Sequence, residues 1–168
     1  MPELAFISLG SNIEPETYLP RAVLALKTLG ELVAVSHVYQ NPAVGPTPQD
    51  DYLNAAVLLS TDRSPFEIRD ALRTIEARLD RVRTEDKYAP RTIDLDLCLL
   101  GAQSLKTSSF ELPDPDILER AHLAIPLAEL MPDFLHPELG APLADIAKRL
   151  RPGAALELRE DLQLGDGI

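Results

Sequence analysis

Two carboxylates that lie two residues apart, Asp94 and Asp96, are the side chains of this sequence best suited to chemistry. Successive side chains of a β-strand point to opposite faces, so Asp94, Asp96 and Cys98 are expected on one face. The opposite face would then carry Ile93, Leu95, Leu97 and Leu99. Two carboxylates on one face repel each other unless a cation lies between them. Because their oxygens are hard ligands and no Cys/His cluster is nearby, the pair favours magnesium over zinc.

Arg91 stands immediately outside this strand, where its guanidinium can meet a phosphate. Residues 69–91 hold seven Lys or Arg against five Asp or Glu, although the whole chain has a net charge of -11. A basic island on an acidic protein suits a small polyanion better than a long one. The sequence therefore indicates a metal–nucleotide site on a buried strand. The alternative is a half-buried strand whose polar face meets water, because a short motif such as Asp-x-Asp recurs by chance.

Composition points to an ordinary globular protein. Of the 168 residues, 45% are hydrophobic and 26% charged, and this length and composition predict one globular domain. We place this domain at 1–150, as far as the resemblance described below extends, and a C-terminal extension at 151–168. The acidic balance argues against a general nucleic-acid or anionic-membrane binder. A single cysteine excludes an internal disulfide, and neither a signal peptide nor a membrane span is recognisable. We therefore expect a cytoplasmic protein, and a monomer, with an oligomer left open.

Apolar periodicity predicts alternating strands and helices that would place these residues. Strands are expected at 3–8, 31–40, 52–61 and 93–100, and helices at 18–29, 64–79, 116–120, 122–130 and 142–150. Ser11, Asn12 or Thr17 would cap the first helix, and Ser64 with Glu67 would form a capping box on the second. Residues 155–159 can make an edge strand, and the last few residues are expected to be loose. This order favours an α+β sandwich with a mixed or antiparallel sheet.

Two loops stand out within this arrangement, at 41–51 and 80–92, and loops of that length in a compact domain are more often functional than idle. Tyr52 and Asn54 follow the first loop and share one face of their strand, which places an aromatic surface beside an amide. No glycine-rich phosphate loop of the P-loop or dinucleotide-binding type is present. Any nucleotide would therefore be held by metal and arginine side chains.

Five segments, taken in order, resemble the 6-hydroxymethyl-7,8-dihydropterin pyrophosphokinase family of folate synthesis. They are SLGSN at 8–12, YQNPAVGPTPQDDYLNAAV at 39–57, RVR at 81–83, APRTIDLDLCL at 89–99 and LPDPDILERAHLAIPLAEL at 112–130. The resemblance covers nearly the whole domain through residue 150. It implies a ferredoxin-like α+β fold and transfer of pyrophosphate from ATP to the pterin hydroxymethyl group, leaving AMP. It also implies two magnesium ions that bridge the triphosphate.

The resemblance assigns roles to particular residues of this chain. Those implied for catalysis are Arg81, Arg91, Asp94 and Asp96, and the two aspartates are also the implied metal ligands. Those implied for ATP are Glu76, Arg83, Leu97, Asp114 and Arg120. Those implied for the pterin are Asn41, Pro42, Ala43, Val44, Tyr52, Asn54 and His122.

This chain departs from the family pattern at two positions. Asp114 stands where the family usually has a histidine, and a carboxylate there repels a nucleotide unless it faces a metal or an arginine. His122 stands where the family usually has a phenylalanine that stacks on the pterin. These departures keep a second hypothesis open: a catalytically weak paralogue that binds pterin or nucleotide without turnover. A third hypothesis, an RNA-binding module, is weakened by the acidic balance and by an aromatic content of only 5%.

Overall fold

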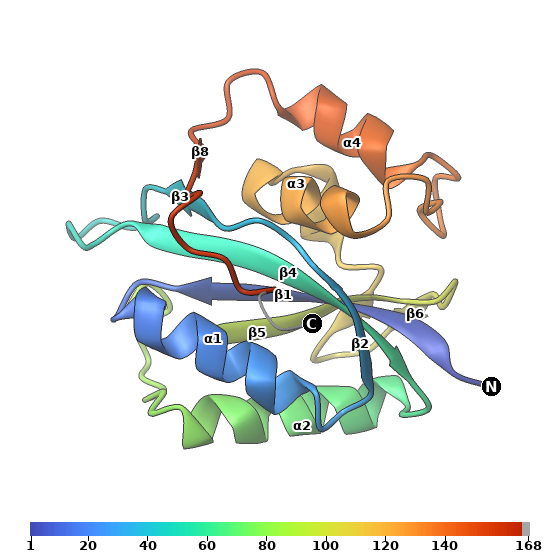
Figure 1. Cartoon of the computed structure of the whole chain (residues 1–168), viewed down its shortest axis with the longest axis horizontal. Coiled ribbons are helices and arrows are strands. Elements are labelled where there is room, and N and C mark those ends of the chain that lie inside the picture. The colour runs from blue at the N-terminus through green and yellow to red at the C-terminus, as the bar shows by residue number, and fades with distance from the viewer. Residues whose placement is uncertain (166–168) are drawn as a thin grey trace.

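A six-stranded sheet in which every pairing is antiparallel organises the computed structural model, which describes residues 1–165 (Figure 1). Its strands are β1 (Glu3–Ser11), β2 (Glu31–Val35), β3 (Tyr39–Asn41), β4 (Tyr52–Thr61), β5 (Asp94–Leu100) and β8 (Glu157–Leu158). They follow the order β5-β1-β4-β3-β8, with β2 also paired to β4. A separate hairpin consists of β6 (Leu105–Lys106) and β7 (Glu111–Leu112). The predicted α+β class, with a mostly antiparallel sheet, is confirmed.

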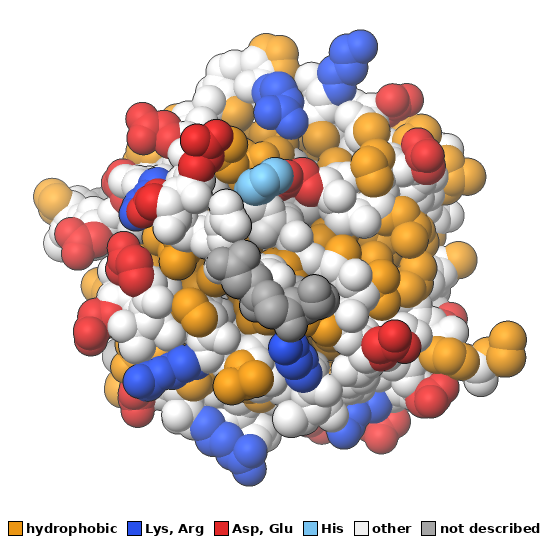
Figure 2. All heavy atoms as spheres, viewed as in Figure 1, with side chains coloured by type: hydrophobic (Ala, Val, Ile, Leu, Met, Phe, Trp, Pro, Cys, Tyr) orange, Lys and Arg blue, Asp and Glu red, His pale blue; other side chains and the backbone are white. Residues whose placement is uncertain are grey.

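The helices lie in two layers, one on each face of the sheet. One face is covered by α1 (Pro15–Leu26) and α2 (Pro65–Arg78), and the other by α3 (Ala121–Leu130) and α4 (Leu143–Leu150) (Figure 1). Because β-strand side chains alternate, Ile7 packs into the core under α1 and α2 while its neighbour Phe6 packs into the core under α3 and α4. On the face that Figure 2 presents, Lys and Arg side chains are dispersed among acidic ones. None of the helices among residues 1–165 is long and apolar enough to span a bilayer.

The starts of α1 and α2 differ in how well the local sequence predicts them. The capping box of α2 is confirmed, because Ser64 Oγ accepts from the Glu67 amide and the Glu67 carboxylate accepts from the Ser64 amide. The prediction that Ser11, Asn12 or Thr17 caps α1 is wrong: the helix begins at Pro15, after Glu14 in a left-handed conformation with φ 44°, and has no side-chain cap. It also ends at Leu26, three residues before the predicted end. The Asn12 side chain is buried and forms hydrogen bonds with Gln49, Asp50 and Arg91 instead.

A bulge in β5 changes which face its last residues occupy. Ile7 pairs with Leu97 but Phe6 pairs with Leu99, so Cys98 is an extra residue on the β5 side. The prediction that Leu99 shares the face of Leu95 is therefore wrong, because Leu99 packs with Phe6 in the core under α3. The bulge lies after the two aspartates, so Asp94 and Asp96 still share one face.

The predicted strand at 31–40 is two strands. β2 and β3 both pair with β4, and between them the Ser36 hydroxyl accepts a hydrogen bond from the Ala56 amide at 2.8 Å. The predicted helix at 116–120 is a short 3-10 helix, Pro115–Leu118. Near the C-terminus, β8 pairs with β3 at the sheet edge. The final residues 166–168, expected to be loose, lie outside the described residues.

Candidate active site

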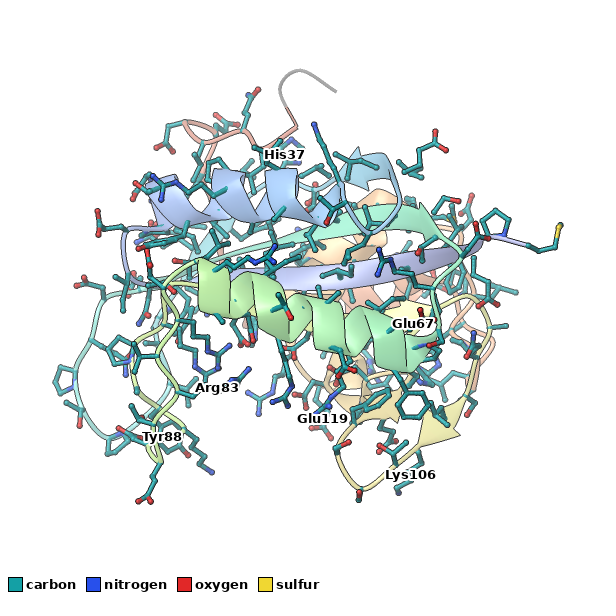
Figure 3. All side chains as sticks on the ribbon, turned by 90° about the horizontal axis from the view of Figure 1, so that it is seen from below. His37, Glu67, Arg83, Tyr88, Lys106 and Glu119 are labelled. Atoms are coloured by element: carbon teal, nitrogen blue, oxygen red, sulfur yellow. The ribbon has the colours of Figure 1, made fainter. Side chains whose placement is uncertain are left out.

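Two clefts meet over the C-terminal end of β1 and the start of β5. The first, of about 560 Å³, lies between α2 and the β6–β7 hairpin. Figure 3 views it from below: Arg83 lies between the loop that carries Tyr88 and the hairpin that carries Lys106. The second, of about 530 Å³, lies over β1, β3 and β4 and under the start of α3. The residues that line both clefts are Arg91, Asp94, Asp96 and Asp114.

Glu76 is the buried anchor of the first cleft, and its residue is only 2% exposed. Its two carboxylate oxygens accept hydrogen bonds from Arg81 at 2.5 Å and from Arg83 at 2.6 Å. The same carboxylate accepts from the Leu95 amide at 2.9 Å, which satisfies a backbone donor of β5. Because protein donors occupy both oxygens, we interpret Glu76 as the residue that orients these arginines toward the cleft.

Asp94 is held between two guanidinium groups. Arg81 donates to its Oδ1 at 3.0 Å and Arg91 donates to its Oδ2 at 2.9 Å. The Arg81 side chain is 8% exposed, and the pKa of Arg81 is raised by Asp94 and Glu76 against the opposing effect of burial. These contacts bring two cations and a carboxylate together at the junction of the clefts.

Asp96 has a different environment from Asp94. No hydrogen bond among residues 1–165 reaches its carboxylate, which is open to solvent on the cleft floor but enclosed by protein on its other sides. Restricted hydration, followed by the negative charges of Asp94, Asp114 and Glu76, raises the pKa of Asp96 to about 7. A divalent cation would relieve this repulsion. The described residues provide no cluster of three or more metal-ligating side chains, so the remaining ligands of a cation at Asp94 and Asp96 would come from substrate or water.

Asp114 belongs to the same junction. Its amide donates to the Cys98 carbonyl at 2.9 Å, which fixes the segment after β7 against β5. Its Oδ1 accepts from the Asp116 amide at 2.9 Å and so caps the 3-10 helix. Burial raises the pKa of Asp114, and the hydrogen bond from the Asp116 amide opposes that shift, with a smaller opposing effect of Arg120. Asp114 lines both clefts, as do Arg91 and the two aspartates of β5.

The floor of the second cleft follows from the strand register. Gly10 pairs with Asn54, and Asn41 pairs with Tyr52, so these side chains share the face that carries Asp94. Asn54 Nδ2 donates to Asn41 Oδ1. A Cβ on Gly10 would stand 3.0 Å from Asn54 Oδ1 and 3.7 Å from Tyr52 Cδ1. The absence of a side chain at Gly10 therefore keeps the floor open beside an aromatic ring and an amide.

His122 and Tyr88 contribute to the walls of the second cleft. Burial lowers the pKa of His122, Arg120 lowers it further, and Asp116 acts in the opposite direction. The imidazole is therefore neutral at pH 7 and offers a flat, uncharged ring. Burial also raises the pKa of Tyr52, so that phenol is neutral as well.

Asn12 connects the two loops that flank the clefts. Its Nδ2 donates to Gln49 Oε1 at 2.6 Å and to the Asp50 carbonyl at 3.1 Å, while its Oδ1 accepts from the Arg91 amide at 2.8 Å. Gln49 in turn donates to the Tyr88 carbonyl at 2.6 Å. The loops at 41–51 and 80–92 are thus joined through one buried amide side chain.

Most of the residues singled out in the sequence meet at this double cleft. The first cleft is lined by Glu76, Arg81, Arg83, Arg91, Asp94, Asp96, Leu97 and Asp114. The second is lined by Asn41, Pro42, Val44, Tyr52, Asn54, Arg120 and His122, together with the shared residues. Arg120, expected on the nucleotide side, therefore lies in the second cleft. Ala43 is not among the residues that line either cleft.

Sequence reasoning missed two arginines and one aromatic residue of the first cleft. Arg69 and Arg73 lie on α2 at spacings of seven and three residues before Glu76, which places all three on one helix face. That spacing is a signal the sequence contains. Arg69 lies over the ring of Phe110, with Cζ 5.3 Å from the ring centroid. Phe110 comes from the β6–β7 hairpin, and no local pattern predicts its approach to α2.

Comparison with known proteins gives a consistent result. The profile of the family described as 7,8-dihydro-6-hydroxymethylpterin-pyrophosphokinase (HPPK) matches residues 6–132. Proteins named 2-amino-4-hydroxy-6-hydroxymethyldihydropteridine pyrophosphokinase are 35% identical in Synechocystis sp. over 98% of this chain and 85% of the relative. In Pseudomonas aeruginosa the identity is 37% over 82% of this chain and 86% of the relative. In Bacillus subtilis the identity is 38% over 77% of this chain and 79% of the relative.

Solved structures show a similar fold. The crystal structure of wild-type Plasmodium falciparum HPPK-DHPS with STZ-DHP superposes with a TM-score of 0.72 at 10% sequence identity, covering 89% of this chain and 43% of that chain. The triple mutant of the same protein with pteroate gives a TM-score of 0.69 at 11% identity, with the same coverage. The chain thus spans less than half the length of these solved chains, and at such low identity the likeness concerns the fold alone.

Proposed function

The chain belongs to the 7,8-dihydro-6-hydroxymethylpterin-pyrophosphokinase family, and on that premise we propose that its two clefts hold the two substrates of the family's reaction. That reaction transfers pyrophosphate from ATP to the hydroxymethyl group of 6-hydroxymethyl-7,8-dihydropterin in folate biosynthesis. The observation that carries the proposal is the wall shared by the two clefts. Its arginine and carboxylates lie where a triphosphate in one cleft and a hydroxyl in the other must meet.

The first cleft supplies the groups that hold ATP. Arg81, Arg83 and Arg91 present guanidinium forks that match phosphate oxygens. Asp94 and Asp96 would hold two magnesium ions, whose contribution when bound is to neutralise the charge that develops during displacement at phosphorus. The N–H donors with which Arg81 and Arg91 contact Asp94 would be available to phosphate oxygens, and the Asp94 carboxylate would then be available to hold a cation.

The second cleft supplies the groups that hold the pterin. Tyr52 and neutral His122 offer flat rings for a heterocycle, and Asn54 offers a donor and an acceptor to its edge. Asn41, Pro42 and Val44 line the same cleft, whereas Ala43 between them does not, and its implied pterin role stays a prediction. This arrangement aims the hydroxymethyl group of the pterin at the shared wall. The loops at 41–51 and 80–92 limit the access of water that would otherwise hydrolyse ATP.

Product identity tests the proposal. The purified protein would be incubated with ATP, magnesium chloride and 6-hydroxymethyl-7,8-dihydropterin, and AMP, ADP and pterin diphosphate would be quantified. We expect AMP and pterin diphosphate in equal amounts. ADP would instead indicate transfer of a single phosphate and would overturn the proposal. Binding of both substrates by a folded protein without AMP formation would support the weak paralogue, for which the carboxylate of Asp114 is the specific structural reason.

The neutral state of His122 predicts a pH dependence of pterin binding. Because its pKa lies below the usual value, the ring stays neutral above about pH 6.5, so from there to pH 8 His122 contributes no change in pterin affinity, and any change in that range reports Asp96, whose pKa is about 7. Below that range the ring gains a proton, and a cation beside Arg120 in an enclosed cleft should weaken pterin binding. Titration calorimetry with the pterin from pH 5 to 8 would show this acid limb, and His122→Phe should remove it. An acid limb of equal size in His122→Phe would contradict the assignment.

Two further predictions rest on the sequence. A cytoplasmic location is expected because a single cysteine fits a reducing compartment. A monomeric state is expected, with an oligomer as the alternative. Gel filtration with light scattering would measure the mass in solution against the 18.4 kDa of one chain.

A further inference from the structure

The C-terminal segment crosses the edge of the sheet beyond the part of the chain that the family profile matches, which ends at residue 132. From the end of α4 the chain runs down past β3 toward the α1 side of the molecule (Figure 1). Residues 156–164 therefore contact both layers of the sandwich. We call these residues the C-terminal strap.

Backbone pairing attaches the strap to β3. Tyr39 pairs with Leu158 and Gln40 pairs with Glu157, and the Arg159 amide donates to the Val38 carbonyl at 2.8 Å. β3 is only three residues long, and its other edge pairs with β4. A strand this short gains much of its order from a second neighbour, because one edge alone supplies few hydrogen bonds.

The side chain of Arg159 ties the strap to both ends of the loop at 41–51. It donates to Gln40 Oε1 at 2.9 Å, and Gln40 Nε2 donates to Asp51 Oδ2, also at 2.9 Å. Gln40 immediately precedes the loop and Asp51 ends it. Two hydrogen bonds therefore bridge the base of the loop, and Asp161 holds the guanidinium in place at 2.8 and 2.7 Å.

This bridge lies on the opposite face of the sheet from the second cleft. Gln40 alternates with Tyr39 and Asn41, so when Asn41 points into the cleft the Gln40 side chain points away from it. Neither Arg159 nor Gln40 lines the second cleft. Any effect of Arg159 on a ligand there must act through β3 and the loop.

Apolar contacts anchor the far end of the strap. Leu164 is buried in the core under α1 and α2, and Leu162 packs against the same core. A segment fixed at β3 and again at this core is held at two points, so it resists rotation of Arg159 away from Gln40.

We propose that Arg159 is a positioning residue for pterin binding and that the C-terminal strap holds β3 and the loop at 41–51 in the conformation that receives the pterin. The proposal rests on the proposed function for the identity of the ligand. It goes beyond that function by giving the strap a role at the pterin cleft. Asn41, Pro42 and Val44 are the cleft residues whose placement depends on this support.

Kinetics and hydrogen exchange of Arg159→Ala test the proposal. We expect the KM for the pterin to rise by up to about tenfold, because the charge-assisted hydrogen bond that is lost stabilises the receiving conformation and does not contact the ligand; kcat and the KM for ATP should stay within about twofold. Without any substrate, amides of residues 39–51 should exchange faster in the variant, while amides of α2 should not. Arg159→Lys keeps a donor for Gln40 and should restore part of the pterin affinity.

Arg63→Ala is the matched control, because it removes one positive charge from an exposed loop position and should change neither readout. Unchanged pterin KM and unchanged exchange at 39–51 in Arg159→Ala would overturn the proposal, as would faster exchange over the whole chain. If the wild-type protein forms no AMP, the proposed function fails, and hydrogen exchange alone then decides the role of the strap. A chain that ends at Gly153 is a second variant and should show the same two changes as Arg159→Ala. If this truncated chain does not fold, the result for Arg159→Ala alone decides the proposal.

Discussion

Replacing Asp96 with alanine should lower kcat by about a thousandfold or more while leaving the fold intact, since several kcal/mol of charge stabilisation correspond to about three powers of ten in rate. The fold should survive because no hydrogen bond among the described residues depends on this carboxylate. Its removal also relieves repulsion with Asp94 and Asp114, so the thermal midpoint should stay level or rise slightly. Steady-state AMP formation and a thermal melt measure the two effects separately.

Two comparisons make this experiment specific. Asp62→Ala removes a carboxylate from an exposed loop position and should leave both kcat and the thermal midpoint unchanged. Asp94→Ala should lose activity as well but should also destabilise the protein, because Arg81 and Arg91 lose their shared partner. If Asp96→Ala retains turnover near the wild-type level, the assignment of Asp96 to the metal site fails.

The Glu76→Ala variant should unfold far more easily than any surface variant. Removing one partner of a buried ion pair costs roughly 3–5 kcal/mol, because the remaining charge stays buried. Here Arg81 would keep Asp94 and the Ile93 carbonyl but lose its buried partner, Arg83 would lose its carboxylate, and the Leu95 amide would lose its acceptor. For a domain of this size such a loss lowers the melting temperature by roughly 10 °C. Urea unfolding followed by circular dichroism measures the free energy directly.

Glu76→Gln separates charge from shape in the same experiment. The amide keeps the volume and one acceptor oxygen but removes the charge between Arg81 and Arg83, so an intermediate loss of stability is expected. The exposed Glu31→Ala is the surface control. A loss for Glu76→Ala within about 0.5 kcal/mol of that control would contradict the role of Glu76 as the anchor of the arginines.

Local sequence predicted the features that depend on local interactions. The capping box at Ser64 was predictable because all of its partners lie within three residues. The strand at 52–61 was predictable because its apolar run lies between a proline-rich loop and a polar turn. The shared face of Asp94 and Asp96 followed from simple alternation, since the bulge at Cys98 comes after them.

Features that depend on distant partners were not predictable in this way. Asn12 has the residue type and position of a helix cap, but its partners Gln49 and Arg91 lie 37 and 79 residues away. Leu99 was assigned to the wrong face because one inserted residue in a strand reverses every later side chain. The link from Arg159 to Gln40 spans 119 residues and leaves no signal in either local pattern.

The double pairing of Asp94 has a consequence for which anions the resting protein admits. Arg81 and Arg91 each donate to Asp94, so a sulfate or inorganic phosphate ion that takes these donors leaves the half-buried Asp94 carboxylate without its two cationic partners. A nucleotide that arrives with its cation offers phosphate oxygens to Arg81 and Arg91. Its cation then takes the place of these arginines as the partner of Asp94. At these two arginines the cleft therefore favours a ligand that brings both charges at once over a simple anion.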